Sequence, residues 1–265
     1  MSYGIEDLIE LMRRLRDPVT GCSWDIKQTY QTIVPSTLEE AYEVADAIEK
    51  EDFVHLKEEL GDLLFQVIFY SQLGKEDGHF DFPQIVDTLV TKLVRRHPHV
   101  FPSGSLYGEN KQTELAEDDV RTQWESLKQK EREAKGSVSL LADIPLGLPA
   151  LTRATKLQKR AASVGFDWSN IEGPIAKVRE EILEVEEAIA SGDMPHIEEE
   201  IGDLLFAVVN ISRTLKLDAE KLLRKANQKF ETRFDYIEAN LQKPLADASL
   251  EEMDALWEQA KKTGI

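Results

Sequence analysis

One acidic pattern occurs twice in this chain, and it constrains the fold more than any other feature. Positions 39–43 read EEAYE and positions 59–62 read ELGD, while positions 180–184 read EEILE and positions 200–203 read EIGD. An offset of 141 residues aligns the two copies without a gap, and more than half of the positions from 39 to 67 are then identical. The repeat therefore predicts two homologous domains, each long enough to bury a core.

Charge and cysteine content narrow the classes of function. The formal net charge of -18 argues against sequence-independent nucleic-acid binding, because such binding needs a surplus of lysine and arginine. Cys22 is the single cysteine, so the chain forms no internal disulfide and nothing indicates an oxidising compartment. The acidic residues Glu6, Asp7 and Glu10 are atypical of a signal peptide, and no apolar run is long enough to cross a bilayer. We expect a cytoplasmic protein that binds neither nucleic acid nor membrane.

Helical periodicity runs through both halves, and no stretch is typical of a strand. In the first half it predicts helices at 5–16, at 36–49, across a segment carrying Leu56 to Ile68, from Pro83 to His97 and at 120–133, with a polar turn at 74–81 and a mobile loop at 102–118. In the second half it predicts helices at 150–163, 174–190, 195–215, 218–240 and 249–262. Glycine and proline residues indicate a linker at 134–149. The fold class is all-α, with two tandem helical bundles at 1–133 and 150–265.

Hairpin geometry places the acids of each copy opposite one another. In an antiparallel helical hairpin, residues equidistant from the turn lie side by side, and i, i+3 spacing stacks two acids on one face. The expected pairs are Glu43 with Glu59 and Glu40 with Asp62, centred on position 51, and Glu184 with Glu200 and Glu181 with Asp203, centred on Gly192. Facing carboxylates repel one another unless a cation lies among them. Their hard oxygens favour Mg²⁺, with Mn²⁺ as the alternative.

A helix rich in glutamate is more often a solvated surface, but two further features weigh against that interpretation. Asp62 and Asp203 directly precede nearly continuous apolar runs, so we expect both carboxylates to be partly buried, where a charge without a partner or a metal is costly. Gly61 and Gly202 lie inside helices, where each costs on the order of 1 kcal/mol relative to alanine. Glycine at the same place in both copies indicates the close approach of another helix or of a ligand.

The motifs that the sequence lacks narrow the chemistry further. The only Glu-x-x-His, from Glu76 to His79, falls in a turn, which argues against a ferritin-type di-iron site. No histidine or cysteine cluster has zinc spacing, and no GxxxxGK[ST] phosphate loop is present. A nucleotide would therefore be held through a metal ion rather than by a phosphate loop.

These motifs resemble the MazG family of nucleoside triphosphate pyrophosphohydrolases, whose signature is EExxE followed by ExxD. The resemblance covers nearly the whole chain and rests on RLRDP at 14–18, GCSWD at 21–25, TLEE at 37–40, RRHPHVF at 95–101, VGFDW at 164–168 and KANQKF at 225–230. The chain is similar to full-length, two-domain bacterial members. The resemblance implies an all-α fold, Mg²⁺ dependence, a homodimer, and hydrolysis of (deoxy)nucleoside triphosphates to the monophosphate and pyrophosphate, in house-cleaning or control of nucleotide pools.

The resemblance also implies roles for residues of the C-terminal half, which is the better supported catalytic half in two-domain members. The implied metal ligands are Glu181, Glu184, Glu200 and Asp203. The implied substrate contacts are Lys177, Asn227, Lys229, Arg233, Trp257 and Lys261. Lys229 and Arg233 are one helical turn apart and can reach the same phosphates, although surface charges have this spacing too. Trp257 is a candidate to stack on a base, with a core tryptophan as the alternative. Glu180 and Glu199 are both candidates to activate water, and the sequence does not choose between them.

The N-terminal half carries a second, less complete set of the same residues. Glu40, Glu43, Glu59 and Asp62 form a candidate second metal site. Lys92 and Arg96 correspond to Lys229 and Arg233, and Trp124 and Lys128 correspond to Trp257 and Lys261, but Val90 stands in place of Asn227. We therefore expect both halves to bind Mg²⁺ and the C-terminal half to carry most of the turnover.

Two interpretations without catalysis compete with the enzyme. In the first, the acidic hairpins form a regulatory nucleotide- and metal-binding dimerisation module, which would release no pyrophosphate from ATP or dTTP with Mg²⁺. In the second, the chain is a structural scaffold, whose thermal stability would not change on adding Mg²⁺ with nucleotide. A ligand that binds only the folded state must raise that stability.

Overall fold

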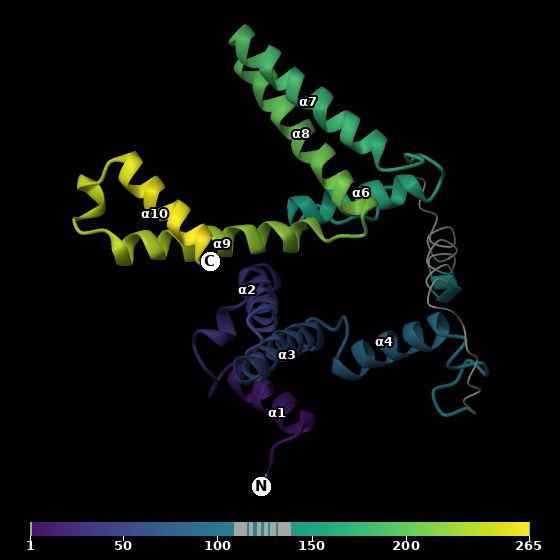
Figure 1. The fold of residues 1–265 in the computed structure, drawn as a ribbon. Helices are drawn as coiled ribbons and strands as arrows, with labels where there is room; N and C mark the ends of the chain where they lie inside the picture. The colour runs from purple at the N-terminus through teal and green to yellow at the C-terminus, as the bar shows by residue number, and fades with distance from the viewer. Residues whose placement is uncertain are drawn as a thin grey trace. The chain divides into compact units, whose positions relative to one another are not determined.

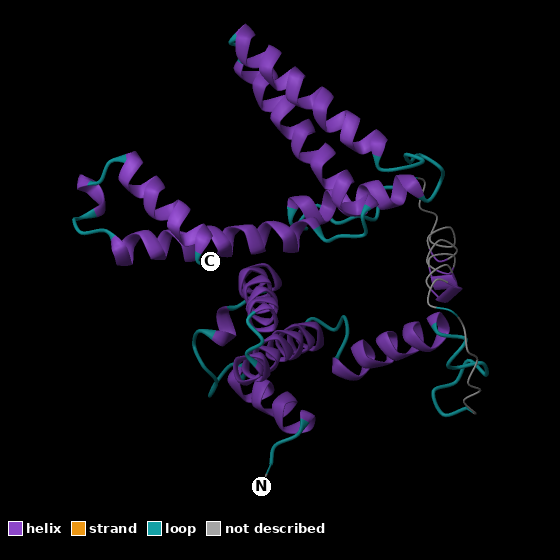
Figure 2. Ribbon diagram, viewed as in Figure 1, coloured by secondary structure: helices purple, strands orange, loops and turns teal. Residues whose placement is uncertain are grey.

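The computed structural model describes residues 2–108, 116, 119, 120, 123, 124, 127, 131 and 139–264. Within these residues every regular element is a helix and none is a strand (Figure 2), so the predicted all-α class is confirmed. The chain divides into two compact units, Met1–Lys130 and Glu131–Ile265. Most of the helix expected at 120–133, part of the loop expected at 102–118 and the start of the expected linker lie outside the described residues. No helix among the described residues is long and apolar enough to cross a membrane.

The first unit is built on a helical hairpin. Its elements are α1 (Ile5–Leu15), the 3₁₀ turn η1 (Asp25–Lys27), α2 (Tyr30–Glu49), α3 (Phe53–Glu76) and α4 (Phe82–Arg96) (Figure 1). The helices α2 and α3 pack along each other, and α1 packs on α3. The core lies at the end of the hairpin distant from its turn and contains Met12, Ile33, Ile68, Phe69 and Leu73. This arrangement leaves the middle of the hairpin, which carries the acidic residues, outside the core.

The start of α2 differs from the prediction of a helix at 36–49. The helix begins at Tyr30, where the Thr32 N–H donates to the Thr29 hydroxyl and caps the first turn. Pro35 lies inside the helix and removes one backbone hydrogen bond. Tertiary packing offsets this loss, because Ile33 is 2% exposed and the ring of Tyr30 stacks on Tyr70 at a centroid distance of 6.2 Å. The polar turn expected at 74–81 is shorter than predicted, since α3 continues to Glu76.

The second unit repeats the hairpin and adds a separate arm. Its elements are α6 (Ala150–Ala162), α7 (Glu172–Ser191), α8 (Met194–Thr214), α9 (Ala219–Asn240), the 3₁₀ turn η2 (Leu245–Asp247) and α10 (Leu250–Lys262). The hairpin α7–α8 projects from α6, whereas α9 leaves the same base in another direction and α10 folds back along it (Figure 1). The buried core of this unit, formed by Ala154, Val209 and Ala219, is smaller than that of the first.

An ion pair fastens each hairpin to the segment that follows the first helix of its unit. In the first unit the Arg16 guanidinium, whose side chain is buried, lies 2.6 Å from Glu76 at the end of α3. In the second unit Arg213, in the last turn of α8, donates from Nη1 to Asp167 Oδ2 at 3.0 Å. The hydrogen bonds from Arg213 hold the pKa of Asp167 below its usual range. The two ion pairs lie at equivalent ends of the hairpins, with the acid and the base exchanged.

The turns of the two hairpins share a left-handed backbone conformation. Gly192 has φ of 71°, and Glu51, at the equivalent position, has φ of 57°. This conformation costs an L-residue roughly 1–2 kcal/mol, and glycine adopts it freely. Glu51→Gly is therefore expected to raise the free energy of unfolding of the first unit by about 0.5–1 kcal/mol, after the greater freedom of glycine in the unfolded chain is allowed for. Gly192→Ala is expected to lower the free energy of unfolding of the second unit by about 1 kcal/mol. Urea denaturation measures both, and a destabilised Glu51→Gly would contradict the assignment of strain to this turn.

Candidate metal centre

In the second unit three carboxylates from two helices form one cluster. Glu181 and Glu184 of α7 and Glu200 of α8 each offer an oxygen, and these oxygens lie within 4.8 Å of one another. The i, i+3 spacing places the two α7 residues on the same face of that helix, and the antiparallel packing of α8 adds the third. The expected approach of Glu184 to Glu200, which follows from their equal distance to the turn, is thus present in the structure.

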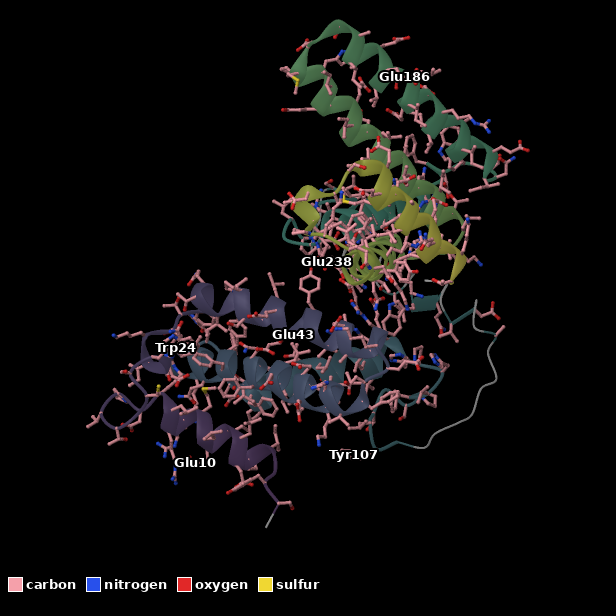
Figure 3. The ribbon with its side chains drawn as sticks, turned by 60° about the vertical axis from the view of Figure 1, so that its left-hand side comes forward. Glu10, Trp24, Glu43, Tyr107, Glu186 and Glu238 are labelled. Carbon is pink, nitrogen blue, oxygen red and sulfur yellow. The ribbon has the colours of Figure 1, made fainter. Side chains whose placement is uncertain are left out.

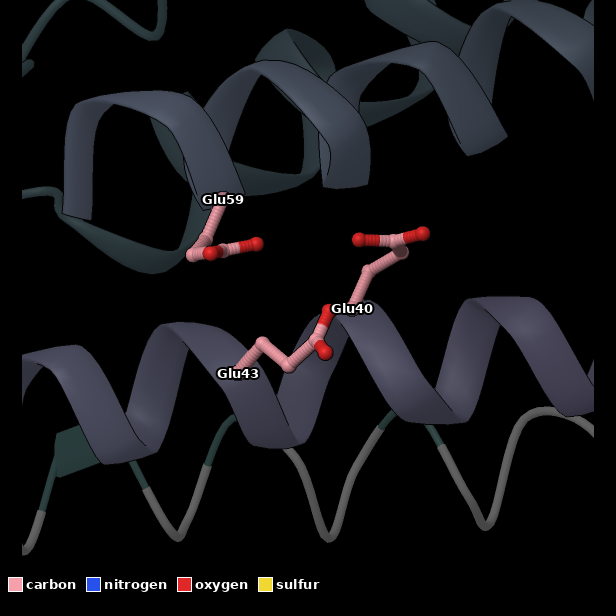
Figure 4. A group of neighbouring side chains, drawn as sticks. All are labelled: Glu40, Glu43 and Glu59. Atoms are coloured by element: carbon pink, nitrogen blue, oxygen red, sulfur yellow. The ribbon is translucent and has the colours of Figure 1, made fainter. Parts of the chain in front are cut away.

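The first unit repeats this cluster with Glu40 and Glu43 of α2 and Glu59 of α3. Figure 4 shows the three side chains extending into the space between the two helices. Burial raises the pKa of Glu40, and the neighbouring Asp62, Glu43 and Glu59 raise it further. Burial also raises the pKa of Glu59, with Glu43 and Asp62 as the next causes. Like charges held this close favour the binding of a cation.

The aspartates lie differently from the prediction. Asp62 and Asp203 are exposed, and neither joins the three-carboxylate cluster of its unit. The apolar run after Asp203 is also more open than expected, since Leu205 is 56% and Phe206 44% exposed. The reason is that a two-helix hairpin covers only one stripe of each helix, so residues on the outer faces remain open. The predicted burial was wrong, and the predicted ligand role of both aspartates stays a prediction.

The mid-helix glycines face open space. A methyl group added at Gly61 or at Gly202 would meet no heavy atom within 4 Å. In the part of the chain that the structure describes, no helix approaches either glycine closely. The close approach predicted from these residues therefore does not come from the described part of the same chain.

Lys177 contacts the carboxylates of the second unit from one turn before the cluster. Its Nζ lies 2.7 Å from Glu180 Oε1, 2.8 Å from Glu181 Oε1 and 3.9 Å from Glu184 Oε2. Hydrogen bonds to Glu180 and Glu181 raise the pKa of the Lys177 ammonium, so it remains charged. Burial raises the pKa of Glu184, Lys177 lowers it, and the neighbouring Glu181 and Glu200 raise it again. The Lys177 ammonium thus compensates only part of the negative charge of the cluster.

One buried carboxylate oxygen of Glu181 indicates that this cluster binds a further ligand. Glu181 is 4% exposed, and its Oε2 has no hydrogen-bond partner among the residues that the structure describes. An unpaired buried carboxylate oxygen is costly. Divalent cations of the Mg²⁺ class take carboxylate oxygens as ligands and retain several waters, so three carboxylates on one side suffice. The donor set therefore fits a divalent metal ion.

A second group of predicted site residues lies on the arm formed by α9 and α10. The Arg233 guanidinium lies over the Trp257 ring at 5.4 Å, and Phe230 contacts the same ring at a centroid distance of 5.3 Å. Lys261 Nζ lies 2.5 Å from Glu258 Oε1. In the first unit Arg96 lies over Trp124 in the same way, at 5.6 Å. Trp257 is half-buried between these neighbours, whereas Asn227 and Lys229 are exposed on α9.

The carboxylate cluster and this second group lie on different parts of the second unit. Figure 3 labels Glu186 on the α7–α8 hairpin and Glu238 on α9, and Figure 1 shows the hairpin and α9 leaving their common base in different directions. The main packing partner of α10 is α9. The α7–α8 hairpin therefore brings together one group of predicted site residues: Lys177, Glu180, Glu181, Glu184 and Glu200. The α10 helix and the facing part of α9 carry the other group: Arg233, Trp257 and Lys261. Glu199 is exposed on α8.

Sequence reasoning missed a histidine beside the cluster. His196 Nε2 lies 3.0 Å from Glu200 Oε1, one helical turn away. His55 is its counterpart in the first unit, but its Nδ1 lies 2.6 Å from Asp52 Oδ2 instead. A signal was available, because both histidines occur four residues before the α8 and α3 glutamates of the two clusters.

Comparison with known proteins agrees with this geometry. A family model described as the MazG nucleotide pyrophosphohydrolase domain matches residues 28–101 and again residues 170–237. The chain is 50% identical over 266 residues to the nucleoside triphosphate pyrophosphohydrolase of Escherichia coli K12, which covers 98% of both chains. It is 41% identical to the nucleoside triphosphate pyrophosphohydrolase/pyrophosphatase MazG of Thermotoga maritima, over 97% of this chain and 95% of that one. Each of the two matched regions contains one carboxylate cluster.

Proposed function

The chain belongs to the MazG family of nucleoside triphosphate pyrophosphohydrolases, and from this premise we propose that it hydrolyses (deoxy)nucleoside triphosphates to the monophosphate and pyrophosphate in its C-terminal unit, with Mg²⁺ as cofactor. The observation that carries this proposal is the cluster of Glu181, Glu184 and Glu200, with its buried unpartnered oxygen. The relatives named above share this activity in their names. House-cleaning or control of nucleotide pools is the physiological role that we propose.

The chain's own residues supply binding and proton transfer. Lys177, beside the cluster, neutralises phosphate oxygens as a point charge. Lys229 and Arg233 lie on α9, apart from the cluster, and would contact the same phosphates only where this arm, from the same or from a second copy, meets the hairpin, the arginine then in fork geometry. Water attacks the α-phosphorus, the bond from that phosphorus to the bridging oxygen breaks, and pyrophosphate leaves. The carboxylate of Glu180 or Glu199 accepts the proton of the attacking water. Glu181, Glu184 and Glu200, with Asp203 as the proposed fourth ligand, would hold a divalent cation, which would neutralise phosphate charge and make water more acidic. Trp257 and Lys261 complete the proposed substrate contacts.

Pyrophosphate release tests the proposed function. Purified protein with ATP or dTTP and Mg²⁺ is expected to release pyrophosphate, and chelation of the metal by EDTA is expected to stop the release. A regulatory module that only binds nucleotide and metal would release none under the same conditions. A panel of canonical, deoxy and modified triphosphates then identifies the preferred substrate.

We also propose that the chain forms a homodimer through the outer faces of the hairpins. The same five positions expose apolar side chains in both units; in the second unit they are Leu183, Ile189, Ile201, Leu205 and Val208. Their exposed fractions range from 44% to 59%. Apolar side chains exposed at the same positions of both units favour an interface there. The open space beside Gly202, on the same helix, allows a second copy to approach the backbone.

Leu205→Glu is expected to convert the dimer into a monomer, because it places a charge in the proposed interface. Leu250→Glu provides the matched control, since Leu250 is 74% exposed at the start of α10, away from the hairpin. Sedimentation analysis measures the mass of each variant. A wild-type chain that sediments as a monomer at micromolar concentration would contradict the dimer.

A further inference from the structure

The two carboxylate clusters differ in one residue that the duplication makes easy to compare. In the second unit Lys177 lies one turn before the cluster, and in the first unit the equivalent position is Ser36. The Lys177 ammonium contacts Glu180 and Glu181 and approaches Glu184. Among the residues that the structure describes, no lysine or arginine forms an ion pair with Glu40, Glu43 or Glu59. The same set of acids therefore exists once with a built-in cation and once without.

The Lys177 ammonium contacts Glu181 through Oε1 and lies 3.9 Å from Glu184 Oε2, so it stands beside two of the three clustered carboxylates, while Glu181 Oε2 has no hydrogen-bond partner among the described residues. A divalent cation at the cluster would meet the Lys177 ammonium at short range, and two positive charges at such a distance repel each other strongly. The ammonium therefore lowers the affinity of the cluster for a divalent cation while it stays in place. Its flexible four-carbon stem and its partly exposed position allow it to turn outward, toward water or toward a new anion. The phosphates of a nucleotide supply that anion.

We propose that Lys177 is a resident counter-ion beside the C-terminal cluster, which weakens the binding of a divalent cation until a triphosphate arrives and then moves to the phosphates. This inference rests on the proposed function of that unit, because it takes a nucleoside triphosphate as the ligand that draws the ammonium away. In consequence, metal and nucleotide bind cooperatively at the C-terminal cluster. The N-terminal cluster, which has Ser36 at this position, takes its metal without nucleotide.

Reciprocal substitutions in the full-length chain test this proposal. Glu43→Gln disables the N-terminal cluster and isolates the C-terminal one, and Glu184→Gln does the reverse. In the Glu43→Gln background, Lys177→Ser is expected to raise the nucleotide-free affinity for Mn²⁺ about tenfold, because one competing charge is removed. In the Glu184→Gln background, Ser36→Lys is expected to lower that affinity about tenfold. Calorimetry and the electron paramagnetic resonance of free Mn²⁺ measure both.

A triphosphate with a methylene group between the α- and β-phosphorus supplies the nucleotide arm, because it resists cleavage at that bond. With this analogue the Mn²⁺ affinity of the C-terminal cluster is expected to rise in the Glu43→Gln chain and to rise much less when Lys177→Ser is added. By linkage, Mn²⁺ must raise the affinity for the analogue by the same factor. Lys177→Gln repeats the test should Lys177→Ser lower the thermal midpoint.

The outcomes separate this inference from the proposed function. An unchanged or lower nucleotide-free Mn²⁺ affinity in Lys177→Ser, with pyrophosphate release by the wild-type chain, overturns the inference alone. The expected affinity changes without pyrophosphate release support the counter-ion and overturn the proposed function. Absence of Mn²⁺ binding with and without the analogue overturns both.

Discussion

Glu184→Ala is expected to reduce pyrophosphate release at least about a hundredfold, because even groups that only support metal ligands contribute about 10–100-fold. Glu184 belongs to the C-terminal cluster, where its oxygen lies within 4.8 Å of those of Glu181 and Glu200. Removing it leaves two carboxylates of the three. Release is measured with ATP or dTTP and Mg²⁺ at a fixed protein concentration.

Glu43→Ala is the matched variant, since Glu43 has the same position in the N-terminal cluster. It is expected to keep most of the turnover. Near-complete loss with Glu43→Ala alone would move the chemistry to the first unit. Unfolding is not expected to affect the comparison, because the Glu184 side chain is 41% exposed and its pKa is raised overall, by burial and by Glu181 and Glu200 against the lowering effect of Lys177. Its removal relieves repulsion, and the thermal midpoint of Glu184→Ala should not fall.

Phe69→Ala is expected to lower the free energy of unfolding of the first unit by about 3–5 kcal/mol. The Phe69 ring is 1% exposed in the core cluster with Met12 and Ile68, and the Arg16 guanidinium lies 5.3 Å from its centroid. The substitution therefore creates a cavity and removes a cation–π contact. Urea denaturation followed by circular dichroism measures the loss.

Phe53→Ala is the control for this substitution, because Phe53 begins the same helix and is 75% exposed. Its effect is expected to stay within about 0.5 kcal/mol. The Phe69→Ala chain should still release pyrophosphate at urea concentrations below those that unfold the C-terminal unit. Equal effects of Phe69→Ala and Phe53→Ala would contradict the position of the core.

The sequence predicts the hairpins well because their information is local. Helical periodicity fixes α7 and α8, and the equal distances of Glu184 and Glu200 from Gly192 fix their register. The start of α2 was predicted six residues late, since a hydroxyl cap at Ser36 with Glu39 and Glu40 in the first turn is typical of a helix start. What overrides that local signal is the burial of Ile33 against α3, which is a tertiary contact.

Sequence spacing predicts that Glu181, Glu184 and Glu200 come together, but it does not predict their contacts. Spacing along one helix places Lys177, Glu181 and Glu184 on a common face, yet it does not reveal that the ammonium bonds to the acids. The burial of Asp203 was predicted from the apolar run that follows it. Leu205, Phe206 and Val208 of that run are exposed in the single chain, whereas Ala207 and Val209 are buried, because hydrophobicity alone does not say whether the same chain or another one covers a side chain. The Asp203 role therefore depends on a surface that the chain by itself leaves open.

The reversed ion pairs at the ends of the hairpins bear on how a duplicated chain assembles correctly. Because the two hairpins are so similar, the segment that carries Arg16 and the segment that carries Asp167 could each dock on either hairpin. Docking on the wrong repeat is a characteristic misfolding error of repeated domains. In a mispaired chain Arg16 would face Arg213, and Asp167 would face Glu76, so like charges would meet at both junctions. In the native pairing each junction joins opposite charges. The exchange of acid and base thus favours docking of each segment on the hairpin of its own unit.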